Sequence, residues 1–417
     1  MTMLRQGSRA IDKLVIIGHG MASQRLLERL AERDERPRHI HVFGDEARPA
    51  YNRILLSPLL AGEIDENGIA LRDAEWFAQH DIRLHSGRRI ERIDRQTRCV
   101  TDNCGEHWHY DRLVIATGSR ARFFDLPGAA LAGIHGFRTT ADVDTLLAAS
   151  GCGRRAVVIG GGLLGLEAAE GLRKRGMTVT LVHRARHLMN RQLDAQAAEL
   201  LSAELARRGL ELRLGCQPTA FEGDGERVDG VLLDSGERLP AALVVTAAGI
   251  LPNAEPGLAA GLAGERAIAV DDTLTTSDTH IHALGECCEF EGTTFGLVEP
   301  IHAQVEVLAE RLCGGDARYA LGDCATQLKI SGIDLYAFGV LDPEAGDEVL
   351  RYVDIEAGDY RRLILRHGVL VGGVLYGDTR DGPWYFHQAQ RRRDLRACRD
   401  TLLFGAHDAS QQLEEAA

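Results

Sequence analysis

Residues 157–170 read Val-Val-Ile-Gly-Gly-Gly-Leu-Leu-Gly-Leu-Glu-Ala-Ala-Glu, a β-branched run that leads into glycines and then into helix-forming residues. In such a strand–turn–helix unit, Gly160 permits the tight turn, Gly162 lets backbone approach a pyrophosphate, and Gly165 lets the helix pack against the strand. The anion then lies at the helix N-terminus. An ordinary glycine-rich turn is the alternative for this stretch alone. The candidate dinucleotide-binding residues of this turn are Gly160, Gly162, Leu163, Leu164 and Gly165.

A second version of the pattern lies near the start of the chain. Residues 14–17 are apolar and run into Gly-His-Gly-Met-Ala-Ser at 18–23, so that Ser23 stands where the third glycine is expected. A small hydroxyl side chain still permits close packing of the helix. The two copies are separated by the length of a domain, so they indicate two similar domains rather than a short solenoid repeat. Two such domains predict two nucleotide ligands. The candidate residues of this turn are Gly18, Gly20, Met21, Ala22 and Ser23.

Length and composition agree with several domains and exclude some partners. The 417 residues exceed what one core usually serves, so two or three domains are expected. A formal charge of −13 argues against nucleic acid as a partner. No stretch reaches membrane-spanning length, and residues 1–9 lack an apolar signal core, so we expect a cytoplasmic protein without a membrane partner. The nine scattered cysteines agree with that compartment.

An acidic pair follows the second strand expected in the first copy. The strand at 40–43 ends at Gly44, and Asp45 and Glu46 come next. A Rossmann unit places a carboxylate at this point to accept hydrogen bonds from an adenosine ribose. A solvated acid in a loop is the alternative for either residue singly.

The segment from Asp45 to Ser57 carries a specific resemblance. Its residues 45–46, 49–53 and 55–57 resemble the flavin-binding segment of the two-dinucleotide-fold flavoproteins, the FAD-dependent pyridine nucleotide-disulfide oxidoreductase superfamily. Within it, the segment is most similar to the flavoprotein portion of the NAD(P)H nitrite reductase large subunit, to the assimilatory nitrate reductase electron-transfer subunit and to the rubredoxin reductases. Arg53 is the candidate partner of the FAD diphosphate, because a guanidinium matches phosphate oxygens, and a surface arginine is the alternative. Those families usually keep an aspartate where Asn52 stands, and more distant relatives keep a lysine near Pro58.

The same segment lacks a redox thiol. Residues 44–70 contain no cysteine, whereas the peroxide reductase and disulfide reductase relatives carry one or two there. Thiolate chemistry therefore has no nucleophile at the place where those relatives need it. The resemblance then implies that the flavin passes its electrons on directly.

Three later stretches resemble further motifs of the superfamily. The apolar strand at 113–115 ends in Ala-Thr-Gly, which in relatives closes the first FAD segment, and residues 243–253 resemble the return from the nicotinamide domain. In 275–286 a glycine precedes Glu286, and in relatives this acid accepts a hydrogen bond from the ribityl chain. On this resemblance the further FAD candidates are Ala116, Thr117, Gly118, Gly285 and Glu286, and Gly249 is a candidate for the NAD(P) site.

Glu299 and Pro300 precede a helix expected at 303–312, and in relatives the start of this helix faces the flavin pyrimidine ring. Both residues are therefore FAD candidates. The neighbouring pair Cys287–Cys288 has no Cys-x-x-Cys beside it, so we interpret it as packing rather than as a metal or redox site. No metal site is expected.

Glu167 is expected in the first turn of the helix that follows Gly162, where the helix dipole alone favours a carboxylate. By resemblance, an acid at this position also approaches the nicotinamide. Both interpretations stay open, and no other residue is assigned a catalytic role.

The choice of nucleotide is open at the sequence level. The strand at 178–182 ends at His183 and Arg184 rather than at an acid. An acid there accepts from the 2′-hydroxyl of NAD, whereas arginine accommodates the 2′-phosphate of NADP, so the residues themselves favour NADPH. The nitrite reductase relatives often have a histidine here and use NADH. His183 and Arg184 are therefore candidates for binding either NADH or NADPH.

The predicted fold is α/β, with two Rossmann-like dinucleotide-binding domains and a small C-terminal α+β domain. We expect an FAD domain at 1–119 and 247–320, split by an inserted NAD(P)H domain at 120–246, and the C-terminal domain at 321–417. Five strands between 325 and 375 and a helical tail with an arginine run at 391–399 make up that last domain. The run is either a solvated helix face or a docking site.

The resemblance implies an FAD-dependent NAD(P)H:acceptor oxidoreductase that passes electrons to a separate redox partner. We expect that partner to be an assimilatory nitrate or nitrite reductase, with rubredoxin or ferredoxin as the alternative, and the protein to be a monomer or a homodimer. Two other functional classes remain as alternatives: a disulfide or peroxide reductase, and a non-catalytic nucleotide sensor.

Overall fold

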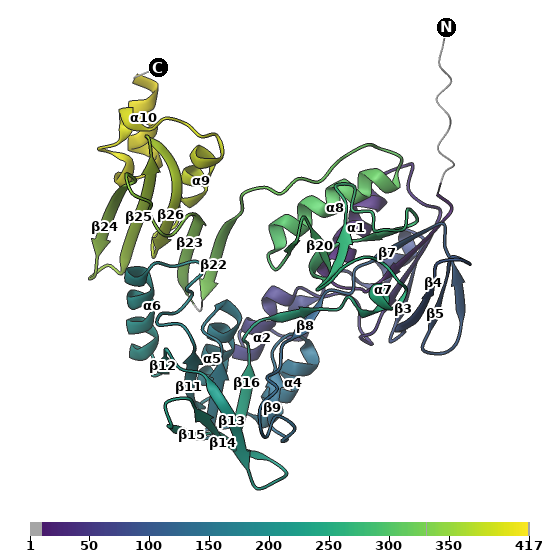
Figure 1. The fold of residues 1–417 in the computed structure, drawn as a ribbon, viewed down its shortest axis with the longest axis horizontal. Coiled ribbons are helices and arrows are strands. Elements are labelled where there is room, and N and C mark those ends of the chain that lie inside the picture. Colours follow the sequence, from purple (N-terminus) through teal and green to yellow (C-terminus); the bar gives the residue numbers. More distant parts are fainter. Residues whose placement is uncertain (1–10, 331, 416–417) are drawn as a thin grey trace. The chain divides into compact units, whose positions relative to one another are not determined.

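The computed structural model describes residues 11–330 and 332–415, which form two compact units. The first unit contains residues 11–55, 64–120 and 250–322. The second unit contains residues 56–63, 121–249 and the described part of the chain from 323 onward. Each unit is built on its own parallel sheet, and Figure 1 labels the helices and strands.

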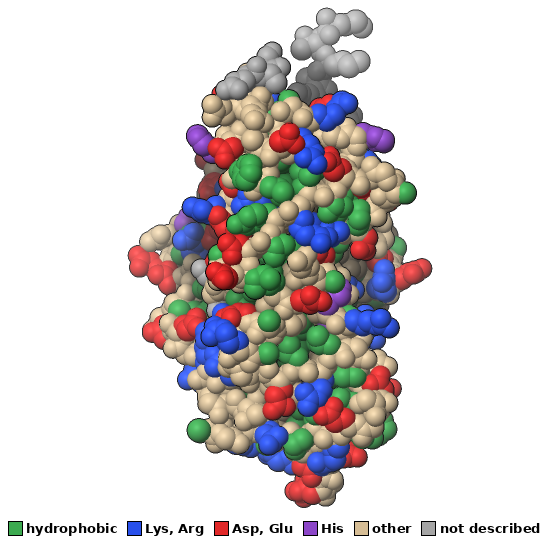
Figure 2. Space-filling model, turned by 90° about the vertical axis from the view of Figure 1, so that its left-hand side faces the viewer, with side chains coloured by type: hydrophobic (Ala, Val, Ile, Leu, Met, Phe, Trp, Pro, Cys, Tyr) green, Lys and Arg blue, Asp and Glu red, His purple; other side chains and the backbone are tan. Residues whose placement is uncertain are grey.

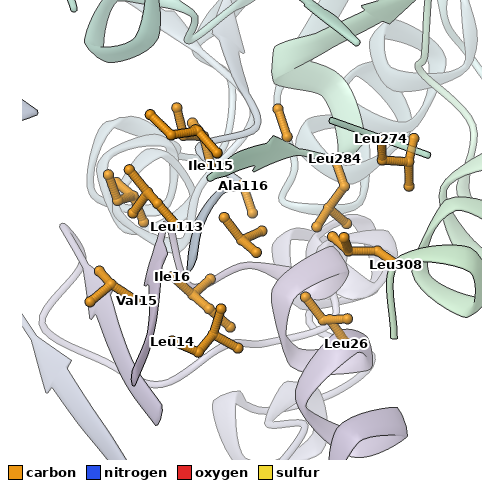
Figure 3. Close-up of a cluster of buried hydrophobic side chains, with 14 of the residues drawn as sticks. Leu14, Val15, Ile16, Leu26, Leu113, Ile115, Ala116, Leu274, Leu284 and Leu308 are labelled. Atoms are coloured by element: carbon orange, nitrogen blue, oxygen red, sulfur yellow. The ribbon is translucent and has the colours of Figure 1, made fainter. Parts of the chain in front are cut away.

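The sheet of the first unit has five parallel strands in the order β19-β7-β1-β2-β3. The central strand β1 is a run of aliphatic residues that are buried after its first position, as expected of a parallel strand covered on both faces. Side chains of β1, β7 and the two helices α1 and α8 meet in one buried cluster (Figure 3). The strands are β1 (Lys13–Ile17), β2 (His39–Gly44), β3 (Ile82–Ser86), β7 (Arg112–Ile115) and β19 (Ile281–Ala283), and the helices are α1 (Met21–Ala31) and α8 (Val298–Leu312).

Shorter elements complete the first unit. An antiparallel meander of three strands contributes Trp108, whose ring meets that of Phe43 edge-on and that of His85 at a tilt, at centroid distances of 5.3 and 4.7 Å. The remaining strands are β4 (Ile90–Asp94), β5 (Cys99–Asp102), β6 (His107–His109), β18 (Ile268–Val270), β20 (Cys288–Phe290) and β21 (Thr293–Thr294). The short helices are α3 (Ala74–Gln79) and α7 (Glu255–Ala259). The chain passes between the units at β8 (Ser119–Ala121) and β17 (Ile250–Pro252).

The second unit repeats the strand–turn–helix pattern in a parallel sheet of order β12-β11-β10-β16-β9. Its strands are β9 (Ile134–Gly136), β10 (Arg155–Ile159), β11 (Thr178–His183), β12 (Glu211–Leu214) and β16 (Leu243–Thr246). Its helices are α2 (Leu56–Ala61), α4 (Thr140–Ala149), α5 (Leu163–Lys174) and α6 (Ala195–Arg207). A three-stranded antiparallel sheet adds β13 (Pro218–Gly223), β14 (Val228–Leu233) and β15 (Arg238–Pro240).

The C-terminal part of the second unit is an antiparallel sheet with helices. Its strand order is β22-β23-β26-β25-β24, and the side chains of Leu363, Tyr385 and Leu402 are fully buried in its core. The strands are β22 (Ala325–Ile330), β23 (Ile333–Gly339), β24 (Glu348–Asp354), β25 (Asp359–Arg366) and β26 (Val369–Tyr376), and the helices are α9 (Gly382–Gln390) and α10 (Ala406–Glu415).

The expected α/β class with a C-terminal α+β part is confirmed. One expected boundary is wrong: α8 begins at Val298, not at 303, so that Glu299 and Pro300 lie in its first turn instead of before it. Proline is tolerated there because the first N–H groups of a helix have no intrahelical acceptor. Among residues 11–330 and 332–415, none of the helices combines the length and the apolar character needed to cross a bilayer.

Candidate dinucleotide sites

The first glycine turn presses against the strand that closes the expected FAD segment. Gly18 has φ +99°, and a Cβ atom on it would lie 2.3 Å from the carbonyl oxygen of Ala116. Its N–H donates to the carbonyl oxygen of Phe43 at 2.8 Å. Only glycine satisfies both the backbone conformation and this close approach. The structure therefore brings Gly18 and Ala116 together.

The helix that follows this turn has an open N-terminus. Gly20 is the N-cap of α1, no side chain caps the helix, and a Cβ atom on Gly20 would meet no atom within 4 Å. The hydroxyl of Ser23 accepts from the N–H of Gly20 and donates to its carbonyl oxygen, both at 3.0 Å. Ser23 is itself fully buried, so the small side chain fits under the turn as expected. Backbone N–H groups in front of open space are suited to an anion.

Arg53 and Glu46 are an ion pair beside this turn. The Arg53 guanidinium donates to Glu46 Oε1 at 2.8 Å, and the Tyr51 hydroxyl donates to Glu46 Oε2 at the same distance. The backbone N–H of Arg53 donates to the sulfur of Met21 at 3.4 Å. Asp45 is exposed where β2 ends. In the structure the guanidinium that the sequence predicts for the FAD diphosphate is therefore paired with Glu46.

The second FAD segment meets the first at Gly118 and Ser119. The Ser119 hydroxyl donates to Glu286 Oε2 at 2.9 Å, and a Cβ atom on Gly118 would lie 3.8 Å from the same oxygen. Gly285 has φ +84°, and its added Cβ atom would lie 3.5 Å from the Cβ of Ala22. Residues from three separate stretches of sequence therefore meet here.

Thr117 and Asn253 are hydrogen-bonded to each other, close to the two places where the chain leaves the first unit and returns to it. The Thr117 hydroxyl donates to the carbonyl oxygen of Asn253 at 2.6 Å, and the Asn253 amide donates to the carbonyl oxygen of Thr117 at 3.0 Å. Thr117 therefore braces the backbone near Gly118 with its side chain. Sequence reasoning did not assign Asn253 this part, because nothing local to residue 253 indicates a partner at 117.

The adjacent cysteines are packing residues in the structure. Both Cys287 and Cys288 are fully buried, and burial raises the pKa of each thiol above its usual range. The Cys287 thiol faces the carbonyl oxygen of Leu284 at 3.3 Å. Thiolates are the reactive form of cysteine, so this environment holds the pair in an unreactive state.

Three buried polar atoms around the first turn fit a ligand of this kind. Among the described residues, His19 Nδ1, Gln24 Nε2 and Gln304 Nε2 are buried without a hydrogen-bond partner. Such atoms are costly unless a ligand or water satisfies them. With the open N-cap Gly20 and the carboxylate of Glu286, the first unit therefore offers polar groups whose chemistry fits a flavin dinucleotide.

The second glycine turn has the same geometry. Gly160 has φ +131°, with its added Cβ atom 2.4 Å from the carbonyl oxygen of Ala247. A Cβ atom on Gly165 would lie 1.8 Å from the carbonyl oxygen of Gly160, whereas one on Gly162 would meet no atom within 4 Å. Gly162 is the N-cap of α5, which begins at Leu163 and Leu164 without a side-chain cap. The turn is thus closely packed at Gly160 and Gly165, whereas the helix N-terminus at Gly162 is open.

His183 is hydrogen-bonded to this turn. Its Nδ1 accepts from the backbone N–H of Gly161 at 3.1 Å, and its Nε2 lies 3.2 Å from Asn190 Oδ1. An acceptor at Nδ1 and a donor at Nε2 define a neutral ring, and burial lowers the pKa of His183 in agreement. Both ring nitrogens are therefore committed to the protein.

The neighbouring arginines face solvent at the same strand end. Arg184 and Arg186 are exposed, and within the described part of the chain neither forms an ion pair. Gly249 has φ +117° and open space where a side chain would be.

Glu167 is a buried acid with one hydroxyl partner. The helix α5 already begins at Leu163, so Glu167 is its fifth residue and does not lie in its first turn, where the sequence had predicted it. The Ser57 hydroxyl donates to Glu167 Oε2 at 2.6 Å. Burial raises the pKa of Glu167 to about 7, although the hydrogen bond from Ser57 acts in the opposite direction. Sequence reasoning missed Ser57 as a partner, since it lies 110 residues away.

Replacing Glu167 with glutamine should change how stability depends on pH. The carboxyl has a pKa of about 7 in the folded protein against 4.5 in the unfolded chain, so the folded protein binds the extra proton between these values. Stability from this group is therefore largest below pH 4.5 and falls as pH rises towards 7. Chemical denaturation at several pH values should show a flatter profile for Glu167→Gln, by roughly 2–3 kcal/mol over that window. The exposed Glu199→Gln is the control, and an unchanged profile in Glu167→Gln would contradict the assignment.

The chain belongs to the pyridine nucleotide-disulphide oxidoreductase family, whose model matches residues 12–306. Members of this family are flavoproteins that bind FAD and NAD(P)H. Residues 325–391 match a second model, the rubredoxin NAD+ reductase C-terminal domain. The family resemblance inferred from the sequence is therefore confirmed.

The chain is similar to several proteins within this family. It is 39% identical to the nitrite reductase (NAD(P)H) of Bacillus subtilis (strain 168) over 92% of this chain and 48% of that protein. It is 36% identical to the assimilatory nitrate reductase electron transfer subunit of the same strain, over 94% of this chain and 51% of that protein. The chain thus spans about half the length of these two relatives. Among solved structures, the covalent putidaredoxin reductase–putidaredoxin complex matches with a TM-score of 0.86 and 26% identity, over 98% of this chain and 99% of that chain.

Proposed function

We propose that this protein is an FAD-dependent NAD(P)H oxidoreductase that passes electrons to a separate redox partner. The observation that carries the proposal is the pair of glycine turns, each with an open helix N-terminus, in two different units of one chain. One turn would take FAD and the other the nicotinamide nucleotide. We further propose that it acts in nitrate or nitrite assimilation and in the cytoplasm; its similarity to the nitrate reductase electron transfer subunit supports the role in assimilation.

The residues of the chain bind and orient in this proposal. Gly18 and Gly20 would let backbone approach the FAD diphosphate, Arg53 with its partner Glu46 would face it, and Glu286 would accept from the ribityl chain. When bound, FAD would supply a group that accepts a hydride, which carries two electrons, and that passes these electrons on one at a time. The start of α8, with Glu299 and Pro300 in its first turn, would favour negative charge on a nearby ring through its dipole.

Glu167 would serve the nicotinamide side. A carboxyl group with a pKa of about 7 keeps its proton in about half of the molecules at neutral pH, whereas an ordinary glutamate has lost it. In that form it can donate a hydrogen bond to the nicotinamide amide instead of repelling electron density. It is a binding and orienting group here, and the hydride itself needs no protein acid or base.

A rubredoxin or ferredoxin reductase is the alternative function. Two similarities favour it: the C-terminal model matched at residues 325–391, and the near-complete coverage of the putidaredoxin reductase chain. Both alternatives share the same flow of electrons and differ only in the acceptor. Disulfide and peroxide reduction are disfavoured, because Cys287 and Cys288 are buried thiols of raised pKa.

The arginine run after α9 is the docking face that we propose for the acceptor. Arg391, Arg392 and Arg393 are exposed, and within the described part of the chain none of them forms an ion pair. Elsewhere charges of both signs are interspersed, as on the face in Figure 2. Arg396 and Arg399 of the same run are paired, with Asp394 and with Glu348 and Asp400. The three other arginines, in a chain of formal charge −13, would steer an acidic redox protein to this place.

Anaerobic reduction followed by acceptor assays tests the function. The purified protein should carry FAD, and NADH or NADPH should bleach its visible absorbance. It should then reduce ferricyanide and an acidic iron–sulfur acceptor, but not nitrite alone or disulfides. A colourless protein that binds nucleotide would favour a sensor, and fast disulfide reduction would contradict one-electron transfer.

Replacing Arg184 and Arg186 with alanine should lower the use of NADPH more than that of NADH. Their exposed guanidinium groups lie at the strand end where a 2′-phosphate is expected. Each lost phosphate contact should cost roughly 1.5–3 kcal/mol in kcat/KM for NADPH. The exposed Arg266→Ala is a control for general loss of positive charge. Equal losses with both nucleotides would show that these arginines make no contact with the 2′-phosphate.

A further inference from the structure

The C-terminal sheet and the second parallel sheet are joined through Asp194. The hydroxyl of Tyr360, on β25, donates to Asp194 Oδ2 at 2.6 Å. Arg362 NH1 lies 3.6 Å from the same oxygen and donates to the carbonyl oxygen of Leu341 at 2.8 Å. Tyr360 is fully buried, and the exposed fractions of the Arg362 and Asp194 side chains are 9% and 12%. This is a desolvated contact between charged and polar groups.

Asp194 faces the C-terminal sheet instead of capping its own helix. It is the N-cap residue of α6, where an aspartate usually accepts from a backbone N–H of the first turn. No such side-chain bond exists at α6. The carboxylate is used for Tyr360, and the acid remains favourable to the helix dipole in either orientation. The Asp194 side chain thus does not cap α6 but accepts a hydrogen bond from Tyr360, which is 166 residues away.

The loop at residues 188–194 connects this contact to the nucleotide turn. The N–H of Met189 donates to the carbonyl oxygen of Gly161 at 2.9 Å, and Asn190 holds the ring of His183, which accepts from the N–H of Gly161. The N–H of Leu193 donates to the carbonyl oxygen of Met189 at 2.9 Å, which closes the loop into a turn. Both backbone groups of Gly161 are therefore held by this loop or by its partner His183.

The loop is too well packed to absorb a displacement at one end. Leu188, Met189 and Leu193 are buried, with at most 2% of their surface exposed. Met189 has φ +50°, a conformation that costs a non-glycine residue free energy and persists only where its surroundings hold it. A change at Asp194 therefore reaches Gly161 within five residues of chain.

We propose that Tyr360 is a positioning residue for the nucleotide site, which holds Asp194 and thereby keeps the 188–194 loop against Gly161. The proposal rests on the assignment of the glycine turn at 160–165 to NAD(P)H. It gives the C-terminal sheet a part in nucleotide binding besides any docking of an acceptor. His183 then acts on the nucleotide through Gly161 and not as a ligand of the ribose.

Nucleotide binding by the FAD-loaded protein tests this role. NADP+ and NAD+ are the probes, since neither reduces the flavin, and their dissociation constants can be followed by flavin or protein fluorescence. Tyr360→Phe should raise the dissociation constant of the better-bound nucleotide roughly 5-fold, the low end of measured coupling between sites. With ferricyanide as acceptor, KM for the nucleotide should rise while kcat stays unchanged. The FAD content should equal that of the wild type.

Tyr376→Phe is the matched control. Tyr376 pairs with Tyr360 across β25 and β26 and is also buried, but its hydroxyl has no hydrogen bond within the described residues. It should bind both nucleotides like the wild type. A 5-fold loss in this variant as well would mean that the sheet, and not the bond to Asp194, is responsible.

A double-mutant cycle separates the bond from general damage. Asp194→Ala should weaken nucleotide binding at least as much as Tyr360→Phe, and the double variant should be no weaker than Asp194→Ala alone. Fully additive losses, or unchanged binding in Tyr360→Phe, would overturn the proposal.

Hydrogen exchange gives a readout that is independent of binding. The amide of Met189 should exchange faster in Tyr360→Phe, whereas the amide of Val158 in β10 should not change. Equal protection of Met189 in both proteins would also overturn the proposal. If the wild type binds neither nucleotide, the function proposed above fails, and this exchange experiment still tests the link between Tyr360 and the loop.

Discussion

Gly165→Ala is expected to abolish nucleotide binding and to destabilise the second unit. The added methyl carbon would lie 1.8 Å from the carbonyl oxygen of Gly160, and the helix α5 can avoid it only by moving away from β10. Gly160 itself is held on its other side by Ala247. Overpacking of this kind costs roughly 1–3 kcal/mol or more. Thermal unfolding and NADP+ titration should both show the change.

Gly162→Ala is the informative comparison for that variant. Gly162 has a negative φ of −88°, and the added methyl group would meet no atom within 4 Å. The variant should therefore lose less stability than Gly165→Ala, because alanine at this N-cap costs only about 1 kcal/mol relative to glycine. It should nevertheless bind nucleotide weakly, because the methyl group fills the space that a pyrophosphate needs. If Gly162→Ala binds nucleotide like the wild type, the open N-terminus of α5 is not the phosphate site.

Glu286→Ala is expected to release most of the FAD from the purified protein. Its carboxylate accepts from Ser119 at 2.9 Å and lies beside Gly118, at the meeting point of the two FAD segments. Loss of hydrogen bonds to a charged group should cost roughly 1.5–3 kcal/mol of binding free energy, which corresponds to about a 10- to 150-fold higher dissociation constant. The ratio of flavin to protein absorbance after gel filtration measures it.

Two further variants interpret that result. Glu286→Gln keeps an acceptor oxygen and should retain more FAD than Glu286→Ala. Ser119→Ala removes only the internal donor, so its flavin content should stay near that of the wild type. Full retention of FAD by Glu286→Ala, or FMN as the released cofactor, would contradict the proposed site.

The strands and the two glycine turns followed from the sequence because their signals are local. The β-branched runs at β1 and β10 end at glycines with positive φ, and these are the places where only glycine fits. The error at α8 has a local cause as well. Pro300 was interpreted as a residue that precedes a helix, whereas proline is equally compatible with a first turn.

The partners of the site residues were not predictable in the same way. Ser57 and Glu167 are 110 positions apart, and Tyr360 and Asp194 are 166 apart. No periodicity or motif links such pairs, since the contact exists only after the sheets have formed. For Arg53, the sequence indicated the charge but could not indicate that Glu46 neutralises it.

The order in which the strands are joined has a consequence for synthesis on the ribosome. In the first parallel sheet, β19 at residues 281–283 pairs with β7 at 112–115, so this sheet cannot close until nearly 300 residues have been made. The second sheet, β12-β11-β10-β16-β9, lies wholly between residues 134 and 246. Because chains emerge from the N-terminus and contacts close in sequence form first, the later-numbered sheet can close before the earlier-numbered one. The nascent chain must meanwhile keep β1 and β7 without their neighbour β19, which makes the N-terminal half the part most exposed to aggregation and to chaperones during translation.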